Sequence, residues 1–140
     1  MSIVNPWVAE SKVLDLYAGS GALGFEALSR GAASVDFVEN AAASLQVIRG
    51  NAEVLGAGAE AVVHRADAMQ FAAKLAAHAY DIAFADPPYD QGLATRIAEL
   101  WLQTPFADLL GIEHRVDERL PGEGERRKYG GTVITFFRSE

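Results

Sequence analysis

Residues 85–89, Ala-Asp-Pro-Pro-Tyr, follow an apolar run and combine a carboxylate, two prolines and an aromatic ring. An exocyclic amine on a nucleobase is a weak nucleophile, because its lone pair is delocalised into the ring. Two acceptors on its two hydrogens would favour a tetrahedral nitrogen and stabilise the positive charge that develops during attack. Asp86 can supply one acceptor and the Pro87 carbonyl the other.

The two prolines restrict the backbone at this point, which would hold the Pro87 carbonyl in place. Tyr89 can stack on a base, which must be unpaired to enter such a site. Asp86, Pro87, Pro88 and Tyr89 are therefore the candidate catalytic residues, and they predict group transfer to a nucleobase amine. A proline-rich turn with a core tyrosine is the simpler alternative.

A second candidate site is the loop DLYAGSGALGFEAL, residues 15–28, which follows an apolar run and opens a helix-like segment. Its three glycines match G-x-G-x-x-G, and Glu39 follows at the distance of about 20 residues expected for an acid that binds ribose. Alone, this pattern fits a dinucleotide site. A P-loop is excluded, because Phe25 and Glu26 stand where lysine and serine or threonine are required.

Asp15 distinguishes between the possible ligands of this loop. A carboxylate beside a pyrophosphate is electrostatically unfavourable, which argues against a dinucleotide. S-adenosylmethionine carries an ammonium and a sulfonium, which a carboxylate would attract. Glu39 could accept from its ribose hydroxyls, and Asp67 from its adenine amine, beside the Ala68 N–H. The predicted cofactor site comprises Asp15, Tyr17, Gly19, Ser20, Gly21, Glu39, Asp67 and Ala68. Taken alone, Asp67 is better explained as a helix N-cap.

The elements that must position these residues alternate between strand and helix. Apolar runs predict strands at 12–17, 34–39, 60–65, 81–86 and 109–115, and the segments between them predict helices at 22–31, 42–56, 68–78 and 93–103. The last 15 residues predict two strands joined at Gly130-Gly131. This order indicates an α/β fold: a mostly parallel, doubly wound, Rossmann-like sheet with an antiparallel C-terminal strand. Ligands of such sheets bind beyond the carboxyl ends of the strands, where Asp15, Glu39, Asp67 and Asp86 are expected.

Composition restricts the possible functions further. A chain of 140 residues predicts one domain, 1–140, and it contains no apolar run long enough to cross a membrane. The absence of cysteine fits a reducing cytoplasm, and the three histidines lack metal-ligand spacing, so no metal is expected. The net charge of −7 argues against binding nucleic acid by charge alone; one dense basic run is present, 126–128. A monomer is expected.

The quoted motifs resemble those of a known family. The runs VLDLYAGSGALGFEALSRGAASVDFVE, ADPPY and RRKYGGTVITFF are similar to the bacterial 16S rRNA guanine-N2 methyltransferases, over about residues 3–138. The resemblance implies a class I methyltransferase that uses S-adenosylmethionine to methylate guanine 966 of 16S rRNA, within a small-subunit particle. It assigns cofactor binding to Asp15, Gly19, Gly21, Glu39 and Asp67, and the target amine to residues 86–89.

One departure from the family pattern affects the expected activity. The family pattern begins with a basic N-terminal hairpin, whereas this sequence begins at MSIVNPW, which would align inside or just after the first helix. The sequence is therefore either part of a longer one or a reduced homologue, expected to bind cofactor but to methylate naked rRNA poorly.

Three other functions stay open. Asp-Pro-Pro-Tyr also occurs in DNA adenine-N6 enzymes, so methylation of adenine or of another amine is one alternative. A cofactor-binding module with little catalysis is the second, and a nicotinamide dehydrogenase is the third and most distant.

Overall fold

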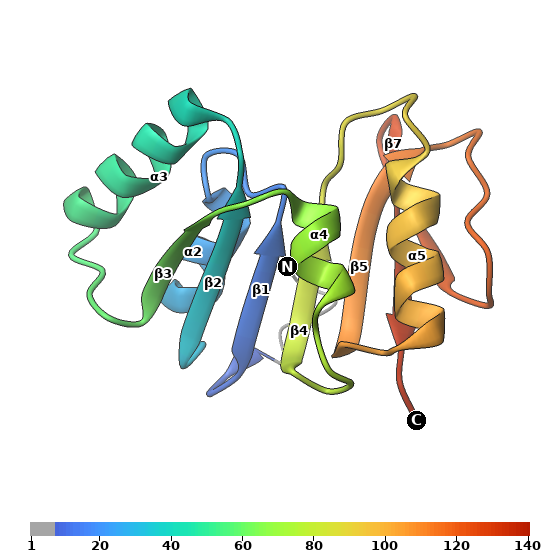
Figure 1. Cartoon of the computed structure of the whole chain (residues 1–140), viewed down its shortest axis with the longest axis horizontal. Helices are drawn as coiled ribbons and strands as arrows, with labels where there is room; N and C mark the ends of the chain where they lie inside the picture. Colours follow the sequence, from blue (N-terminus) through green and yellow to red (C-terminus); the bar gives the residue numbers. More distant parts are fainter. Residues whose placement is uncertain (1–7) are drawn as a thin grey trace.

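The fold is one seven-stranded sheet with helices on both faces (Figure 1). The structure is a computed structural model that describes residues 8–140. The first seven residues of the expected domain, from which the absence of the hairpin was inferred, lie outside the described residues. The strands are β1 (Lys12–Leu16), β2 (Ser34–Glu39), β3 (Ala61–Arg65), β4 (Tyr80–Ala85), β5 (Ala107–Arg115), β6 (Glu125–Tyr129) and β7 (Thr132–Arg138). The helices are α2 (Ala22–Ser29), α3 (Ala42–Val54), α4 (Ala68–Ala73) and α5 (Leu93–Gln103).

The sheet order is β3-β2-β1-β4-β5-β7-β6. The first five strands pair in parallel, and β7 pairs antiparallel with both β5 and β6. This confirms the predicted mostly parallel, doubly wound sheet with an antiparallel C-terminal strand. The chain winds outward from β1 to β3 and then returns to β4 on the other side of β1. The β1–β4 boundary is therefore the point where strand order reverses, and ligands of open α/β sheets bind at the carboxyl ends there.

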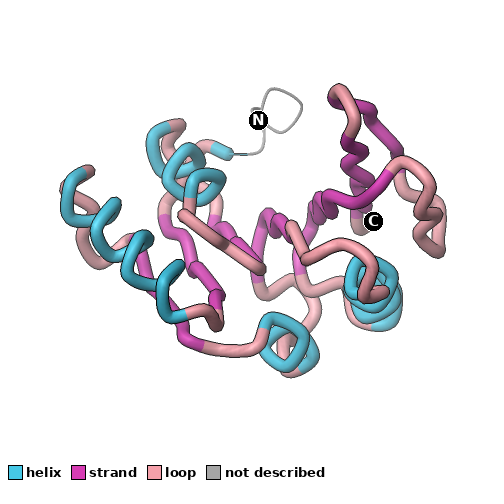
Figure 2. The backbone as a smooth tube through the Cα atoms, turned by 90° about the horizontal axis from the view of Figure 1, so that it is seen from above, coloured by secondary structure: helices cyan, strands magenta, loops and turns pink. Residues whose placement is uncertain are grey.

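Two apolar layers cover the sheet, one on each face. Phe25 of α2 and Ile48 of α3 pack with Val35 and Phe37 on one face. The buried sides of α4 and α5 pack on the opposite face, which includes Trp101. Figure 2 shows α2 and α3 on one side of the strands and α4 and α5 on the other. Because the central strands are buried on both faces, they have near-continuous apolar sequences.

Most element boundaries agree with the sequence pattern, and α4 is the main exception. A helix was expected over 68–78, but α4 ends at Ala73. The following residues turn away because their backbone pairs elsewhere: the His78 N–H donates to Pro105 O and the Tyr80 N–H to Phe106 O. Tertiary pairing with the segment before β5 thus overrides the helix propensity of an alanine-rich run. Within residues 8–140, no helix is both long and apolar enough to span a bilayer.

Candidate active site

Four carboxylates stand on one face of the sheet, near the carboxyl ends of four adjacent strands. Side chains alternate along a strand, and Val35, Val13, Ile82 and Leu109 all belong to the core layer under α2 and α3. Residues an even number of positions further along point to the same face. These are Glu39 of β2, Asp15 of β1, Asp86 after β4 and Glu113 of β5. In Figure 1 the loops that leave these strand ends lie along the upper edge of the sheet.

A pocket of about 520 Å³ opens at this edge. Its walls come from the glycine loop, the end of β2, the segment after β4 and β5. The lining residues are Tyr17, Gly19, Glu39, Asp86, Pro87, Pro88, Tyr89 and Glu113. The two motifs singled out by the sequence, residues 15–28 and 85–89, therefore share one cavity.

The glycine loop turns sharply before α2. Tyr17, Gly19 and Gly21 have φ values of 58°, 60° and 81°, so three loop residues adopt the left-handed region. This conformation is strained for a tyrosine and accessible to glycine. No atom lies within 4 Å of the position that a Cβ on Gly19 would occupy. The loop backbone is thus open to a ligand at Gly19.

Gly24, the third glycine, has a different role. A Cβ at Gly24 would stand 2.3 Å from Cε1 of Phe37 and 2.8 Å from Cγ1 of Val35. Gly24 therefore lets α2 pack closely on β2, which sets the position of the loop that precedes the helix.

Glu39 joins the end of β2 to this loop. Its Oε1 accepts a hydrogen bond of 2.8 Å from the Gly19 N–H, and its Oε2 accepts bonds of 2.9 Å from the Asn40 and Ala41 N–H groups. A carboxylate can accept about four hydrogen bonds, so one acceptor position is left for a ligand. Glu39 is half-buried and lines the pocket.

Asp15 lies beneath the pocket, outside its lining. Its side chain is buried, and Oδ2 accepts from the Gly24 N–H at 3.2 Å. Burial raises the pKa of this carboxyl to about 8, partly offset by the Gly24 hydrogen bond and reinforced by the negative charges of Asp86 and Glu39. Asp15 thus anchors α2 to β1, and a cationic ligand above it would favour its ionised form.

Asp67, Ala68 and Ser20 stand outside the pocket lining. Asp67 is the N-cap of α4, and its Oδ1 accepts from the Gln70 N–H at 2.9 Å. Ala68 is buried in the core on the α4 side. Ser20 is exposed, and its carbonyl accepts from Asn51 Nδ2 at 3.1 Å. The pKa of Tyr17, a pocket residue, is raised first by burial and then by the negative charge of Asp67. Asp67 therefore lies near the pocket.

The Asp-Pro-Pro-Tyr segment leaves β4 directly into the pocket. The Asp86 N–H lies 3.4 Å from Leu16 O and thereby meets the end of β1. Pro87 is buried, whereas Asp86 and Pro88 are exposed. Tyr89 is 40% exposed, which excludes the alternative of a core tyrosine.

Tyr89 is held at the pocket mouth by contacts to β5 and β7. Its hydroxyl lies 3.4 Å from Thr132 Oγ1, and the Arg115 guanidinium lies 5.7 Å from its ring centroid. Arg115 also pairs with Asp90 at 3.8 Å and Asp117 at 3.5 Å. The ring is thus positioned from the side of β5 and β7 and stays partly exposed.

Glu113 is the pocket residue that the sequence motifs did not indicate. The parallel register pairs Ala85 with Ile112, which makes Asp86 and Glu113 neighbours one position further along. A hydrogen bond to Asp86, desolvation and the repulsion of the Asp86 charge raise the pKa of Glu113 to about 7. An isolated glutamate in a strand carries no motif, so finding it from sequence required the register of β4 against β5.

The basic run lies on the edge strand β6. Arg126 donates to Glu118 O at 3.0 Å and to Val116 O at 2.9 Å, so it holds the β5–β6 connection. Arg127 pairs with Glu125 at 3.1 Å, and Lys128 is exposed. Part of this small positive charge is thus used within the fold.

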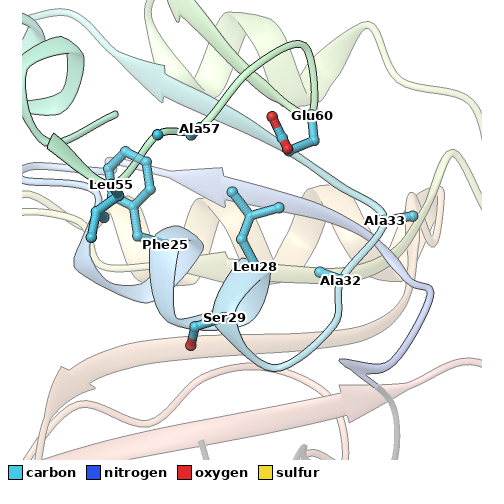
Figure 3. A pocket seen from close by; sticks show the side chains of 9 residues that line it. Phe25, Leu28, Ser29, Ala32, Ala33, Leu55, Ala57 and Glu60 are labelled. Carbon is cyan, nitrogen blue, oxygen red and sulfur yellow. The ribbon is translucent and has the colours of Figure 1, made fainter. Parts of the chain in front are cut away.

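A second pocket, of about 330 Å³, lies at the opposite edge of the sheet, in the loops that precede β2 and β3 (Figure 3). Its lining is mainly apolar and includes one ionisable side chain, Glu60. None of the predicted site residues lines it. The carboxyl-end pocket is therefore the stronger candidate for chemistry.

Comparison with known proteins identifies the family. The sequence profile of the family described as "Conserved hypothetical protein 95" matches residues 1–138. Ribosomal RNA small subunit methyltransferase D of Escherichia coli (strain K12) is 38% identical over 122 residues, covering 83% of this chain and 59% of that protein. The protein of the same name in Haemophilus influenzae is 35% identical over 122 residues, covering 82% and 62%.

The solved structures give the same fold. A putative methyltransferase from Escherichia coli superposes with a TM-score of 0.85 at 31% identity, covering 99% of this chain and 81% of that one. A putative methylase from Haemophilus influenzae gives 0.84 at 27% identity, covering 98% and 91%. The Rossmann-like, class I methyltransferase fold is therefore established, while the chain spans about three-fifths of the length of the curated relatives named above.

Proposed function

The chain belongs to the family described as conserved hypothetical protein 95, and from this we propose that it transfers a methyl group from S-adenosylmethionine to the exocyclic N2 amine of a guanine in 16S ribosomal RNA. The observation that carries the proposal is the shared pocket, which brings the glycine loop and Asp86-Pro-Pro-Tyr together. The relatives' names support ribosomal RNA as the substrate class.

The residues present fit S-adenosylmethionine by their chemistry. The cofactor carries ribose hydroxyls and an adenine amine, which are donors, together with two cationic groups. Glu39 retains an acceptor position for the ribose, and the open backbone at Gly19 permits close approach. Glu39 would supply negative potential for the cationic groups, and their charge would favour the ionised form of Asp15; the cofactor has no pyrophosphate to oppose this. Bound there, the cofactor would supply an electrophilic methyl group.

Asp67 and Ala68 would hold the adenine at the edge of the pocket. The Asp67 carboxylate uses Oδ1 as a cap, so Oδ2 can accept from the adenine amine. The cap and the cofactor role, which the sequence presented as alternatives, are therefore compatible in one side chain. Tyr17 lines the pocket next to this region and would contact the cofactor, with Ser20 and Gly21 shaping the loop.

The target amine would be held by the segment after β4. Asp86 and the Pro87 carbonyl would accept from its two hydrogens, which localises the lone pair and stabilises charge on nitrogen as the methyl arrives. Tyr89, which is partly exposed and lines the pocket, would stack on the base. One proton must leave the nitrogen after transfer, and the exposed Asp86 carboxylate can pass it to solvent. Most of the rate enhancement would come from alignment rather than from a strong base.

The net charge of the chain indicates whether free rRNA or an assembled particle is the better substrate. A net charge of −7 and a short basic run make strong binding to naked RNA unfavourable. We therefore expect a small-subunit particle to be a better substrate than free 16S rRNA, with the reaction in the cytoplasm. Guanine 966 is the nucleotide that the family resemblance assigns.

The test is transfer of a tritiated methyl group to unmodified small subunits and to free 16S rRNA. Asp86→Asn should lower transfer by about 100-fold or more, because its negative charge is needed as positive charge develops on the nitrogen, and should change cofactor affinity by less than about twofold. Asp90→Asn is the matched control: it removes one charge from the same turn, and asparagine tolerates its φ of 66°. Full activity of Asp86→Asn, or equal losses in both variants, would contradict the assignment.

A further inference from the structure

The carboxylates of Asp86 and Glu113 form a side-by-side pair in the amine pocket. The pairing of Ala85 with Ile112 continues by one residue to place Asp86 beside Glu113, on adjacent strands about 4.8 Å apart. Strand alternation directs both to the face that carries Asp15 and Glu39, and both line the pocket. The pair therefore offers two neighbouring acceptors to whatever enters beside Pro87.

No cation of the described residues neutralises this pair. The same pocket is also lined by Glu39, Tyr17 and Tyr89, with Asp15 beneath. The nearest basic residue along β5, Arg115, pairs with Asp90 and Asp117, and the β7 residue opposite Glu113 is Ile134. Two carboxylates left together in a half-enclosed site are unfavourable unless a proton or a ligand with several donors satisfies them.

Nucleobases differ in what stands next to the exocyclic amine. In guanine the N2 amine is adjacent to N1–H, so the edge presents three N–H hydrogens in a row. In adenine and cytosine the amine is adjacent to a ring nitrogen that accepts. Asp86 and Glu113 are neighbouring acceptors, and with the Pro87 carbonyl as a third acceptor they would complement guanine. An ionised Glu113 facing the ring nitrogen of adenine or cytosine would be repelled.

Resting on the proposed function, we propose that Glu113 selects guanine by accepting the N1–H of the base whose N2 amine is held by Asp86 and Pro87. Glu113 is thus a specificity-determining residue of the methyl-acceptor site. The same geometry disfavours the adenine-N6 alternative, which the Asp-Pro-Pro-Tyr motif by itself left open.

The protonation state of Glu113 gives the selection a pH dependence. The raised pKa, about 7, means that the empty site carries a proton on the pair below neutral pH. Glu113 can accept the N1–H of guanine only after that proton has left the pair, so methylation of guanine should increase as pH rises through about 7. A base with an acceptor at N1 requires the proton to stay, so its methylation should decrease over the same range.

The experiment compares guanine with 2-aminopurine, which keeps the 2-amino group but has an acceptor at N1. Mass spectrometry first maps the methylated nucleotide. Ligation then inserts guanine or 2-aminopurine at that position, in whichever substrate form supports transfer, naked RNA or the assembled subunit. The readout is the ratio of kcat/KM for the two bases, with wild type and Glu113→Gln at pH 6 and pH 8. Glu99→Gln, which removes one exposed carboxylate from α5, is the control.

Wild type should prefer guanine by about tenfold or more at pH 8 and by less at pH 6. Glu113→Gln should reduce this preference by about tenfold, because its amide N–H can donate to N1 of 2-aminopurine, and should lose the change between the two pH values. Glu99→Gln should behave as wild type. An unchanged ratio in a folded Glu113→Gln overturns the inference alone.

Should Glu113→Gln fail to fold, the wild-type ratio still decides: equal preference at pH 6 and pH 8 refutes the role of Glu113. If no guanine is methylated at the mapping step, the proposed function fails and the inference fails with it.

Discussion

Asp15→Asn should change how stability depends on pH. The folded carboxyl has a pKa of about 8, against an unperturbed value of 3.8, because its burial disfavours the charge. Between these two pH values the folded chain holds a proton that the unfolded chain has released. The free energy of unfolding therefore falls as pH rises, with a slope of up to about 1.4 kcal/mol per pH unit from this group.

Integrated from pH 5 to pH 8, this slope amounts to about 3–4 kcal/mol. Asparagine does not titrate, and its Oδ1 can still accept from the Gly24 N–H that Asp15 binds. We therefore expect the variant to match wild type near pH 5 and to exceed it by a few kcal/mol at pH 8. The wild-type aspartate would then lower stability in return for function, because its carboxyl can ionise when a cationic ligand binds.

Urea unfolding followed by circular dichroism at pH 5, 6, 7 and 8 measures the difference between the two proteins. The comparison cancels the repulsion among the other acidic residues, which both proteins share. Parallel stability curves, within about 1 kcal/mol over the whole range, would show that Asp15 is not titrating in the folded state and would refute the reasoning.

Three further substitutions test the site and its support. Glu39→Gln should weaken cofactor binding by about 1.5–3 kcal/mol in calorimetry, and unchanged affinity would remove Glu39 from the site. Gly24→Ala should destabilise the protein by about 1–3 kcal/mol, because its Cβ would meet Phe37 at 2.3 Å. Gly50→Ala, in the open part of α3, should stabilise the protein, and equal shifts in melting temperature for the two variants would contradict this. Tyr89→Ala should raise the substrate KM while Tyr89→Phe stays mild; equal effects would exclude stacking.

Much of the fold was predictable from local sequence patterns, because the apolar residues in those patterns are the ones that the fold buries. The helix expected over 93–103 matches α5, whose spaced apolar residues face the core. The strand expected over 34–39 matches β2, in which Val35, Phe37 and Val38 are buried. Where the pattern failed, at 74–78, the deciding contacts were hydrogen bonds to Pro105 and Phe106, which no local window contains.

The site was predictable where chemistry is written in consecutive residues. The glycine loop and residues 86–89 are motifs of that kind, and they meet in one pocket. The burial of Asp15 beneath the pocket and the presence of Glu113 within it depend on side-chain direction and strand register. Neither can be read from a motif, because each is fixed by a neighbouring strand.

The most direct test of the account is the identity of the methylated nucleoside. Small subunits or 16S rRNA lacking the modification are incubated with the protein and labelled S-adenosylmethionine, and the RNA is digested and analysed by mass spectrometry. The account predicts label in N2-methylguanosine at a single position, lost with Asp86→Asn. Label in N6-methyladenosine or in ribosomal protein, or no transfer by a chain that binds the cofactor, would contradict it.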